Sequence, residues 1–191
     1  EAIMNDGSYR TGDEEQDTQK SKWFEYLGES YIAEAFKMAH KADPEVRLFY
    51  NDYYNYLPEK QQGIYNMLKG LLDDGVPVHG VGLQCHLRIE PSNNSSHHAY
   101  YQTVENLEKA ILLYSSIGLD IQITEMDISI YSPNISYTQD NYYTVETFTK
   151  EIEEIQAERY REYFELFRKH SNVISSVTFW GIADDNTWLS E

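Results

Sequence analysis

Carboxylate, imidazole and amide side chains follow short apolar runs of this chain, at the points where those runs end. Glu125 and Asp127 come directly after one run, and Gln84 and His86 close an earlier one. A carboxylate that lies near an imidazole and a second carboxylate suits hydrolytic chemistry, either as a nucleophile or acid/base pair or as part of a metal site. These four residues are therefore the first candidates for chemistry.

Two further runs end in the same way. One is followed by Asn51, Asp52 and Tyr53, and the last is followed by Trp180, Asp184, Asp185 and Trp188. Each residue also has an ordinary structural interpretation: Glu125 as a capping or ion-paired carboxylate, His86 as a buried structural histidine, and Trp180 as core. The recurrence at four successive runs favours a shared site over four unrelated structural roles.

A metal site is the competing interpretation of the same side chains. His86, Glu125, Asp127 and Asp52 are all residue types that bind metals in hydrolases. Against it, the chain has no H-E-x-x-H motif, and its only close histidine pair, His97-His98, lies in a Ser/Asn-rich stretch and is expected to be solvated. We therefore predict no metal and no cofactor.

The elements that must position these side chains alternate between helix and strand. Apolar spacing predicts helices over 23–41, 58–73, 99–116 and 150–170, and strands over 46–50, 78–84, 119–124 and 173–180, with a loop over 87–98. Such alternation predicts parallel βαβ units, and four strands are half of an eight-stranded α/β barrel. In a parallel barrel, the carboxyl ends of all strands lie on one face, where catalytic residues collect. We expect one domain, residues 1–191.

The composition of the chain limits the classes of ligand that it is expected to bind. The formal charge of the 191-residue chain is −17, which argues against nucleic acid, anionic membranes and polyanionic substrates, and is compatible with a neutral substrate. Gly80 and Gly82 lie inside a predicted strand and indicate close backbone packing rather than a phosphate loop. The single cysteine, Cys85, has apolar neighbours and is interpreted as a buried structural thiol.

Four stretches resemble successive motifs of glycoside hydrolase family 10, in order and in spacing. They are LFYNDYYNY (48–56), GVGLQCH (80–86), ITEMDIS (123–129) and TFWGIADDNTWL (178–189), and the opening EAIMNDGSYR resembles the stretch directly after that family's acid/base motif. The resemblance covers essentially the whole chain. It implies a (β/α)8 TIM barrel, of which this chain supplies strands 5 to 8, that cleaves internal β-1,4-xylosidic bonds of xylan or xylo-oligosaccharides with retention of configuration.

The resemblance also implies a role for each candidate. Glu125 matches the nucleophile and Glu1 the general acid/base; His86 and Asp127 match the pair that orients the nucleophile. The implied substrate contacts are Gln84, Asn51, Tyr53, Trp180 and Trp188, with Tyr54 as an alternative to Tyr53 for stacking on a sugar.

The family's first four strands are absent from these residues, apart from Glu1. We therefore expect the chain alone to be weakly active or inactive, and its open sheet edges to pair with the missing N-terminal half or with another copy. A non-catalytic carbohydrate-binding remnant and a cellulase-like β-1,4-glucanase remain as alternatives. A polymeric substrate implies a secreted, periplasmic or cell-surface location.

Overall fold

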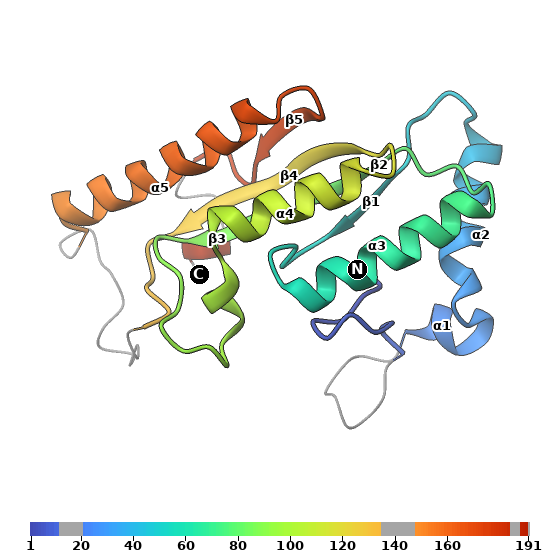
Figure 1. Cartoon of the computed structure of the whole chain (residues 1–191), viewed down its shortest axis with the longest axis horizontal. Coiled ribbons are helices and arrows are strands. Elements are labelled where there is room, and N and C mark those ends of the chain that lie inside the picture. Colours follow the sequence, from blue (N-terminus) through green and yellow to red (C-terminus); the bar gives the residue numbers. More distant parts are fainter. Residues whose placement is uncertain (12–20, 135–147, 184–187, 191) are drawn as a thin grey trace.

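A computed structural model describes residues 1–11, 21–134, 148–183 and 188–190. The strands are β1 (Phe49–Asp52), β2 (Gly80–Leu83), β3 (His86–Arg88), β4 (Asp120–Ser129) and β5 (Ile174–Phe179). The helices are α1 (Lys22–Leu27), α2 (Ser30–Ala42), α3 (Pro58–Asp73), α4 (Val104–Ser115) and α5 (Lys150–Lys169), with 3₁₀ turns at His98–Tyr101 and Trp188–Ser190. Figure 1 shows α3 and α4 running side by side in front of the strands.

The strands form one sheet in which every pair is parallel. β1 pairs with β2, β2 and β3 both pair with β4, and β5 pairs with β4. The chain crosses from strand to strand through α3, α4 and α5, as parallel pairing requires. The predicted parallel βαβ organisation is confirmed, and within the described residues β1 and β5 each have one neighbour.

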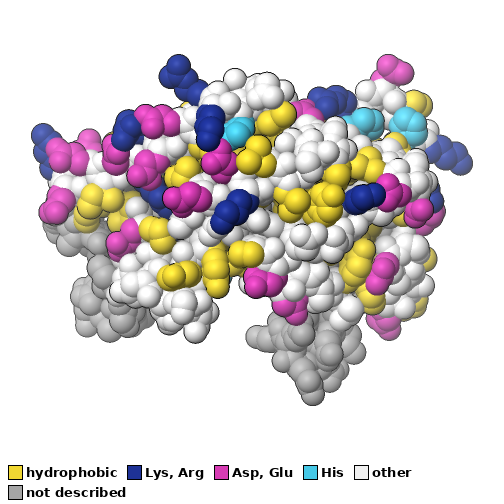
Figure 2. Space-filling view, in the orientation of Figure 1, with side chains coloured by type: hydrophobic (Ala, Val, Ile, Leu, Met, Phe, Trp, Pro, Cys, Tyr) yellow, Lys and Arg dark blue, Asp and Glu magenta, His cyan; other side chains and the backbone are white. Residues whose placement is uncertain are grey.

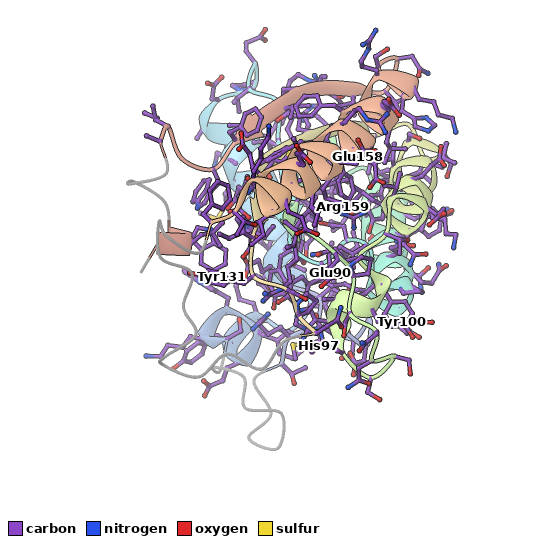
Figure 3. All side chains as sticks on the ribbon, turned by 90° about the vertical axis from the view of Figure 1, so that its left-hand side faces the viewer. Glu90, His97, Tyr100, Tyr131, Glu158 and Arg159 are labelled. Carbon is purple, nitrogen blue, oxygen red and sulfur yellow. The ribbon has the colours of Figure 1, made fainter. Side chains whose placement is uncertain are left out.

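The hydrophobic core lies between the sheet and these helices. It includes fully buried side chains from α3 and α4, such as Leu68 and Ile111, and from the strands, such as Val81 and Ile123. The outer faces of the helices are charged, and Figure 2 shows acidic and basic side chains interspersed over this side of the molecule. Figure 3 shows α5 from its end, with Glu158 and Arg159 on it. No helix among the described residues is both long and apolar enough to cross a membrane.

Several predicted bounds are wrong. The single helix over 23–41 is two helices, because Gly28 adopts φ 58° and ends α1. The predicted loop over 87–98 begins with strand β3, and the helix expected from residue 99 starts as a 3₁₀ turn before α4. The predicted strand over 119–124 extends to Ser129, so the polar residues expected after it lie within β4.

Candidate active site

Glu125 lies in an irregular part of β4, where that strand carries one more residue than its neighbour. Leu83 of β2 pairs with Ile123 of β4, and the next pair is His86 of β3 with Asp127 of β4. Three residues of β4, 124–126, therefore lie opposite two residues of the neighbouring segment, 84–85. On the shorter side, Cys85 adopts φ 59°, a left-handed conformation. Bulges of this kind bend a strand and redirect side chains. The carboxylate of Glu125 is thereby presented at the carboxyl end of the sheet.

Asn51, at the end of β1, donates a hydrogen bond from Nδ2 to Oε1 of Glu125 at 2.8 Å. The amide has a defined orientation because the hydroxyl of Thr124 donates to its Oδ1 at 2.7 Å. Gly82 provides the space for it, since a Cβ at that position would lie 2.3 Å from the same Oδ1. The close packing predicted from the strand glycines is confirmed, and one of them makes room for a side chain that contacts Glu125.

His86 lies between two carboxylates. Its Nε2 is 3.4 Å from Oε2 of Glu125, and its Nδ1 is 2.9 Å from Oδ2 of Asp127. Burial opposes protonation of the ring, but the hydrogen bond and charge of Asp127, together with Glu125, outweigh it and raise the pKa of His86. The imidazolium so favoured places a positive charge beside the side chain of Glu125.

Two tryptophans stand beside this histidine. The Nε1 of Trp188 donates to Oδ2 of Asp127 at 2.8 Å, and its ring centroid lies 5.3 Å from that of His86. Trp180 approaches His86 edge-on, with centroids 6.3 Å apart. Both indoles are about half exposed, at 48% for Trp180 and 52% for Trp188. They therefore offer apolar faces next to the carboxylates. Asp184 and Asp185 lie outside the described residues.

Glu1 is joined to Glu125 through one residue, Gln84. The side-chain Nε2 of Gln84 donates to Oε1 of Glu1 at 2.9 Å, while its backbone oxygen accepts from the backbone N of Glu125 at 3.1 Å. The backbone N of Ala2 donates to the hydroxyl of Tyr50 at 2.9 Å, which holds the chain next to Glu1 against β1. The two carboxylates are thus held at the same end of the sheet.

A buried ion pair lies beneath this end. Nζ of Lys60 is 2.8 Å from Oδ1 of Asp52, and both side chains are 0% exposed. Asp52 also accepts from the hydroxyl of Tyr50, the group that binds Ala2. Burial lowers the pKa of Lys60, and the charge of Asp52 opposes that shift. Asp52 is therefore committed to this pair and does not join His86 and Glu125 in the alternative metal set.

Tyr53 and Tyr54 lie in different surroundings. The hydroxyl of Tyr53 accepts from Arg10 at 2.8 Å, and Nζ of Lys60 lies 3.6 Å from its ring centroid. Tyr54, with φ 53°, stacks on His98 with centroids 4.4 Å apart. It is Tyr54 that lines a cavity of about 250 Å³ beside His86.

This chain matches a known protein family over its whole length. The profile described as glycosyl hydrolase family 10 matches residues 1–191. The chain belongs to glycosyl hydrolase family 10. It is 40% identical over 189 residues to an endo-1,4-beta-xylanase of Geobacillus stearothermophilus, a match that covers 99% of this chain and 51% of that protein. The chain thus spans about half the length of the curated relatives it matches.

Solved family 10 structures match in the same way. A GH10 endoxylanase from a sugarcane soil metagenome superposes with a TM-score of 0.85 and 37% identity, covering 100% of this chain and 51% of that one. An intracellular xylanase of Thermoanaerobacterium saccharolyticum, solved in complexes with xylotriose and xylotetraose, has a TM-score of 0.77 and 31% identity; all of this chain aligns with just under half of that one. The predicted fold, part of a (β/α)8 barrel, and the family resemblance are both confirmed.

Most of the candidates in this family 10 chain converge at one end of the sheet. Glu1, Gln84, Asn51 and Glu125 form one hydrogen-bonded group, to which His86 adds Asp127, Trp188 and Trp180. Among the residues that the structure describes, no three His, Cys, Asp or Glu side chains are placed to hold a metal ion.

Two local expectations have different outcomes. His97 and His98 are not simply solvated: they stack on each other with centroids 4.3 Å apart, and both are partly buried. Cys85 is buried, as predicted, and burial raises the pKa of its thiol, which suits a structural role.

Sequence reasoning missed three residues that support the site. Thr124 orients Asn51, Lys60 neutralises Asp52, and Arg10 binds the hydroxyl of Tyr53. The lysine had no signal in the sequence, because it lies on the amphipathic helix α3 at a position that resembles any exposed lysine. Thr124 directly precedes Glu125, and only its pairing across the sheet reveals its partner.

Proposed function

We propose that this chain forms the nucleophile-bearing part of an endo-1,4-β-xylanase that cleaves internal β-1,4-xylosidic bonds with retention of configuration. Family membership and the names of the relatives support the substrate class. The observation that carries the proposal is the linkage through Gln84, which places the two carboxylates, Glu1 and Glu125, at one end of the sheet. Retaining glycosidases need two carboxyl groups about 5–5.5 Å apart, one on each side of the bond that is cleaved.

In the first step, Glu125 attacks the anomeric carbon and forms a glycosyl-enzyme ester. The hydrogen bond from Asn51 and the contact with His86 hold this carboxylate in the orientation for attack. Glu1 donates its proton to the oxygen of the leaving sugar, so that the departing group leaves as a neutral alcohol.

In the second step, Glu1 acts as a base. Its carboxylate takes a proton from water, the water oxygen attacks the anomeric carbon, and the ester bond to Glu125 breaks. Two inversions at the same carbon give net retention. Trp180 and Trp188 supply apolar faces for the sugar rings near the reacting bond, because pyranose rings stack well on indoles.

The 191-residue chain by itself is proposed to turn over xylan weakly or not at all. It spans about half the length of its relatives, and β1 and β5 each have one neighbour among the described residues. The side chains that would complete the sugar-binding face opposite Glu125 belong to the other half of the barrel.

The test uses an aryl β-xylobioside and compares Glu125→Gln with Glu1→Gln. An aryl leaving group needs little protonation, so Glu1→Gln keeps most of the first step, whereas Glu125→Gln loses it by on the order of 10⁴-fold. Both are made in the chain alone and in a chimera that joins it to the preceding half of the Geobacillus relative. Glu34→Gln, an exposed change on α2, is the matched control.

Proton NMR of the product reports the anomer formed first. A β product supports retention, and an α product rules it out. Equal rates for Glu125→Gln and the unsubstituted protein, with sugar binding unchanged, would reject the hydrolase and leave a carbohydrate-binding protein. Turnover by the chain alone at about 10 s⁻¹, an ordinary enzyme rate, would refute the proposed weakness of the isolated chain.

A further inference from the structure

The cavity beside His86 is lined by residues of two neighbouring strands, which are His86, Leu87 and Arg88 of β3 and Asp127 and Ser129 of β4. Because side chains alternate along a strand, His86 and Arg88 of β3 point to the same face, as do Asp127 and Ser129 of β4. The strands pair His86 with Asp127 and Arg88 with Ser129, and all four residues line the cavity of about 250 Å³. That volume is just under the range of about 300–1,000 Å³ of drug-sized ligand pockets, and suits one monosaccharide-sized group.

Arg88 brings a positive charge to this cavity, and none of the carboxylates that the structure describes pairs with it. Its guanidinium donates from Nη1 to the backbone oxygen of Tyr131 at 3.2 Å. Within the described ranges, 1–11, 21–134, 148–183 and 188–190, no Asp or Glu oxygen lies within 4.0 Å of it. Acidic residues outnumber basic ones about two to one in this chain, and Arg88 nevertheless lines the cavity without an acidic partner among the described residues.

The carboxylate of Asp127, which lines the same cavity, does not pair with Arg88. Its Oδ2 is already bound by His86 at 2.9 Å and by Nε1 of Trp188 at 2.8 Å. Its charge is therefore balanced by the imidazolium of His86, and the charge of Arg88 remains available to a ligand.

The other walls of the cavity are neutral and partly aromatic. They include Tyr54, Tyr56, Gln102 and His98. Burial, then the charges of His97 and Arg88, lower the pKa of His98 to about 4, so its ring is neutral at pH 7. The side-chain Nε2 of Gln102 donates to the hydroxyl of Tyr56 at 3.2 Å and to the backbone oxygen of His86 at 3.1 Å. These walls offer stacking surfaces and hydrogen bonds, and the charge comes from Arg88.

We propose that this cavity binds the carboxylate of an acidic sugar substituent, a uronic acid carried as a branch on the neutral substrate chain, through Arg88. The inference rests on the proposed function, because it places the branch next to a sugar chain bound at Trp188 and His86. A guanidinium recognises a planar carboxylate through two parallel hydrogen bonds, which a hydroxymethyl group in the same position cannot replace. The neutral aromatic walls suit the pyranose ring of the branch.

The experiment measures binding rather than turnover, so it does not depend on activity. The 191-residue chain carrying Glu125→Gln is titrated by calorimetry with xylotriose that bears one glucuronic acid branch. The matched ligand is the same sugar after reduction of its carboxyl group to a hydroxymethyl. We expect the acidic ligand to bind about 10- to 100-fold more tightly, the range for a hydrogen bond to a charged group. We expect the preference to shrink in about 1 M salt.

Variants assign the preference to one residue. Arg88→Gln is expected to remove it while leaving affinity for the reduced ligand within about 2-fold, and Arg88→Lys to keep part of it. Arg47→Gln, an exposed arginine paired with Asp120 at 2.8 Å, makes the same charge change elsewhere and should keep the full preference. Circular dichroism checks that Arg88→Gln remains folded, and Arg88→Lys supplies the readout if it does not.

Equal affinity for the acidic and reduced ligands, or no binding of either, overturns the inference. A preference that survives Arg88→Gln assigns the carboxylate to a different group and also overturns it. The proposed function fails by a separate result, the rate of Glu125→Gln on the aryl xylobioside. The two failures are therefore distinguishable.

Discussion

The buried pair Lys60–Asp52 allows a quantitative prediction. Lys60→Met removes the ammonium and keeps most of the side-chain volume, so the cavity term is small. The carboxylate of Asp52 then stays at 0% exposure without the cation that lay 2.8 Å away. It keeps its bonds from the hydroxyl of Tyr50 and the backbone N of Tyr53.

The expected loss is about 3–5 kcal/mol in the free energy of unfolding, the range for removing one partner of a buried pair. Domain stabilities are about 5–15 kcal/mol, so the loss is a large part of the total. The double variant Lys60→Met with Asp52→Asn should lose no more than either single variant, because it leaves no unpaired charge. Lys37→Met, which breaks the exposed pair with Glu34 at 3.3 Å, should cost about 1 kcal/mol or less.

Urea unfolding at pH 7, followed by circular dichroism, measures all of these proteins. A loss below about 1 kcal/mol for Lys60→Met would mean that the ammonium is hydrated in solution, and the argument from burial would fail. A double variant as unstable as the sum of the single variants would show that the two side chains act independently.

Three further predictions concern the site and the cavity beside it. Gly82→Ala places a Cβ 2.3 Å from Oδ1 of Asn51 and 2.8 Å from Cγ2 of Thr124, so it should displace the amide of Asn51 from Glu125. We expect the rate of aryl xylobioside cleavage to fall at least about 10-fold, which corresponds to the loss of one hydrogen bond to a charged group. The control Gly70→Ala has open space around the new Cβ and should leave this rate unchanged. The pKa of His86 is raised in the folded protein, so its contribution to stability is fully present below about pH 6.5 and is lost as the pH rises through the folded-state pKa. The variant His86→Gln should therefore show a smaller decrease in unfolding free energy above about pH 6.5. For His98 the pH dependence of the unfolding free energy has the opposite sign, because its pKa is lowered to about 4. Its contribution to stability is lost as the pH falls from about 6.5 towards that value. An NMR titration that gives this ring an ordinary pKa would contradict the prediction.

Strong local patterns predicted the helices best. The helix expected over 58–73 is α3, Pro58–Asp73, because a proline in its first turn and a regular apolar face both act locally. The helix expected over 150–170 is α5, Lys150–Lys169. The strand over 119–124 was predicted too short, because the polar residues beyond it break the apolar run while the backbone continues to pair.

The three-residue strand β3 could not be predicted. Its residues His86–Arg88 carry no alternation long enough to read, and the strand exists because β4 pairs with it after the irregular stretch. The same pairing brings Arg88 next to His86 and Asp127 in one cavity. Periodicity within one segment contains no information about such a partner.

The amino-acid sequence by itself determined the family, the alternation of helix and strand, and the types of residue at the strand ends, because these depend on short stretches of chain. Only the tertiary structure decided how those residues meet. Glu125 is presented by an extra residue in β4, oriented by Asn51 from β1 and linked to Glu1 through Gln84 of the intervening segment. These contacts join residues more than 70 positions apart, and strand register, a property of the assembled sheet, sets them.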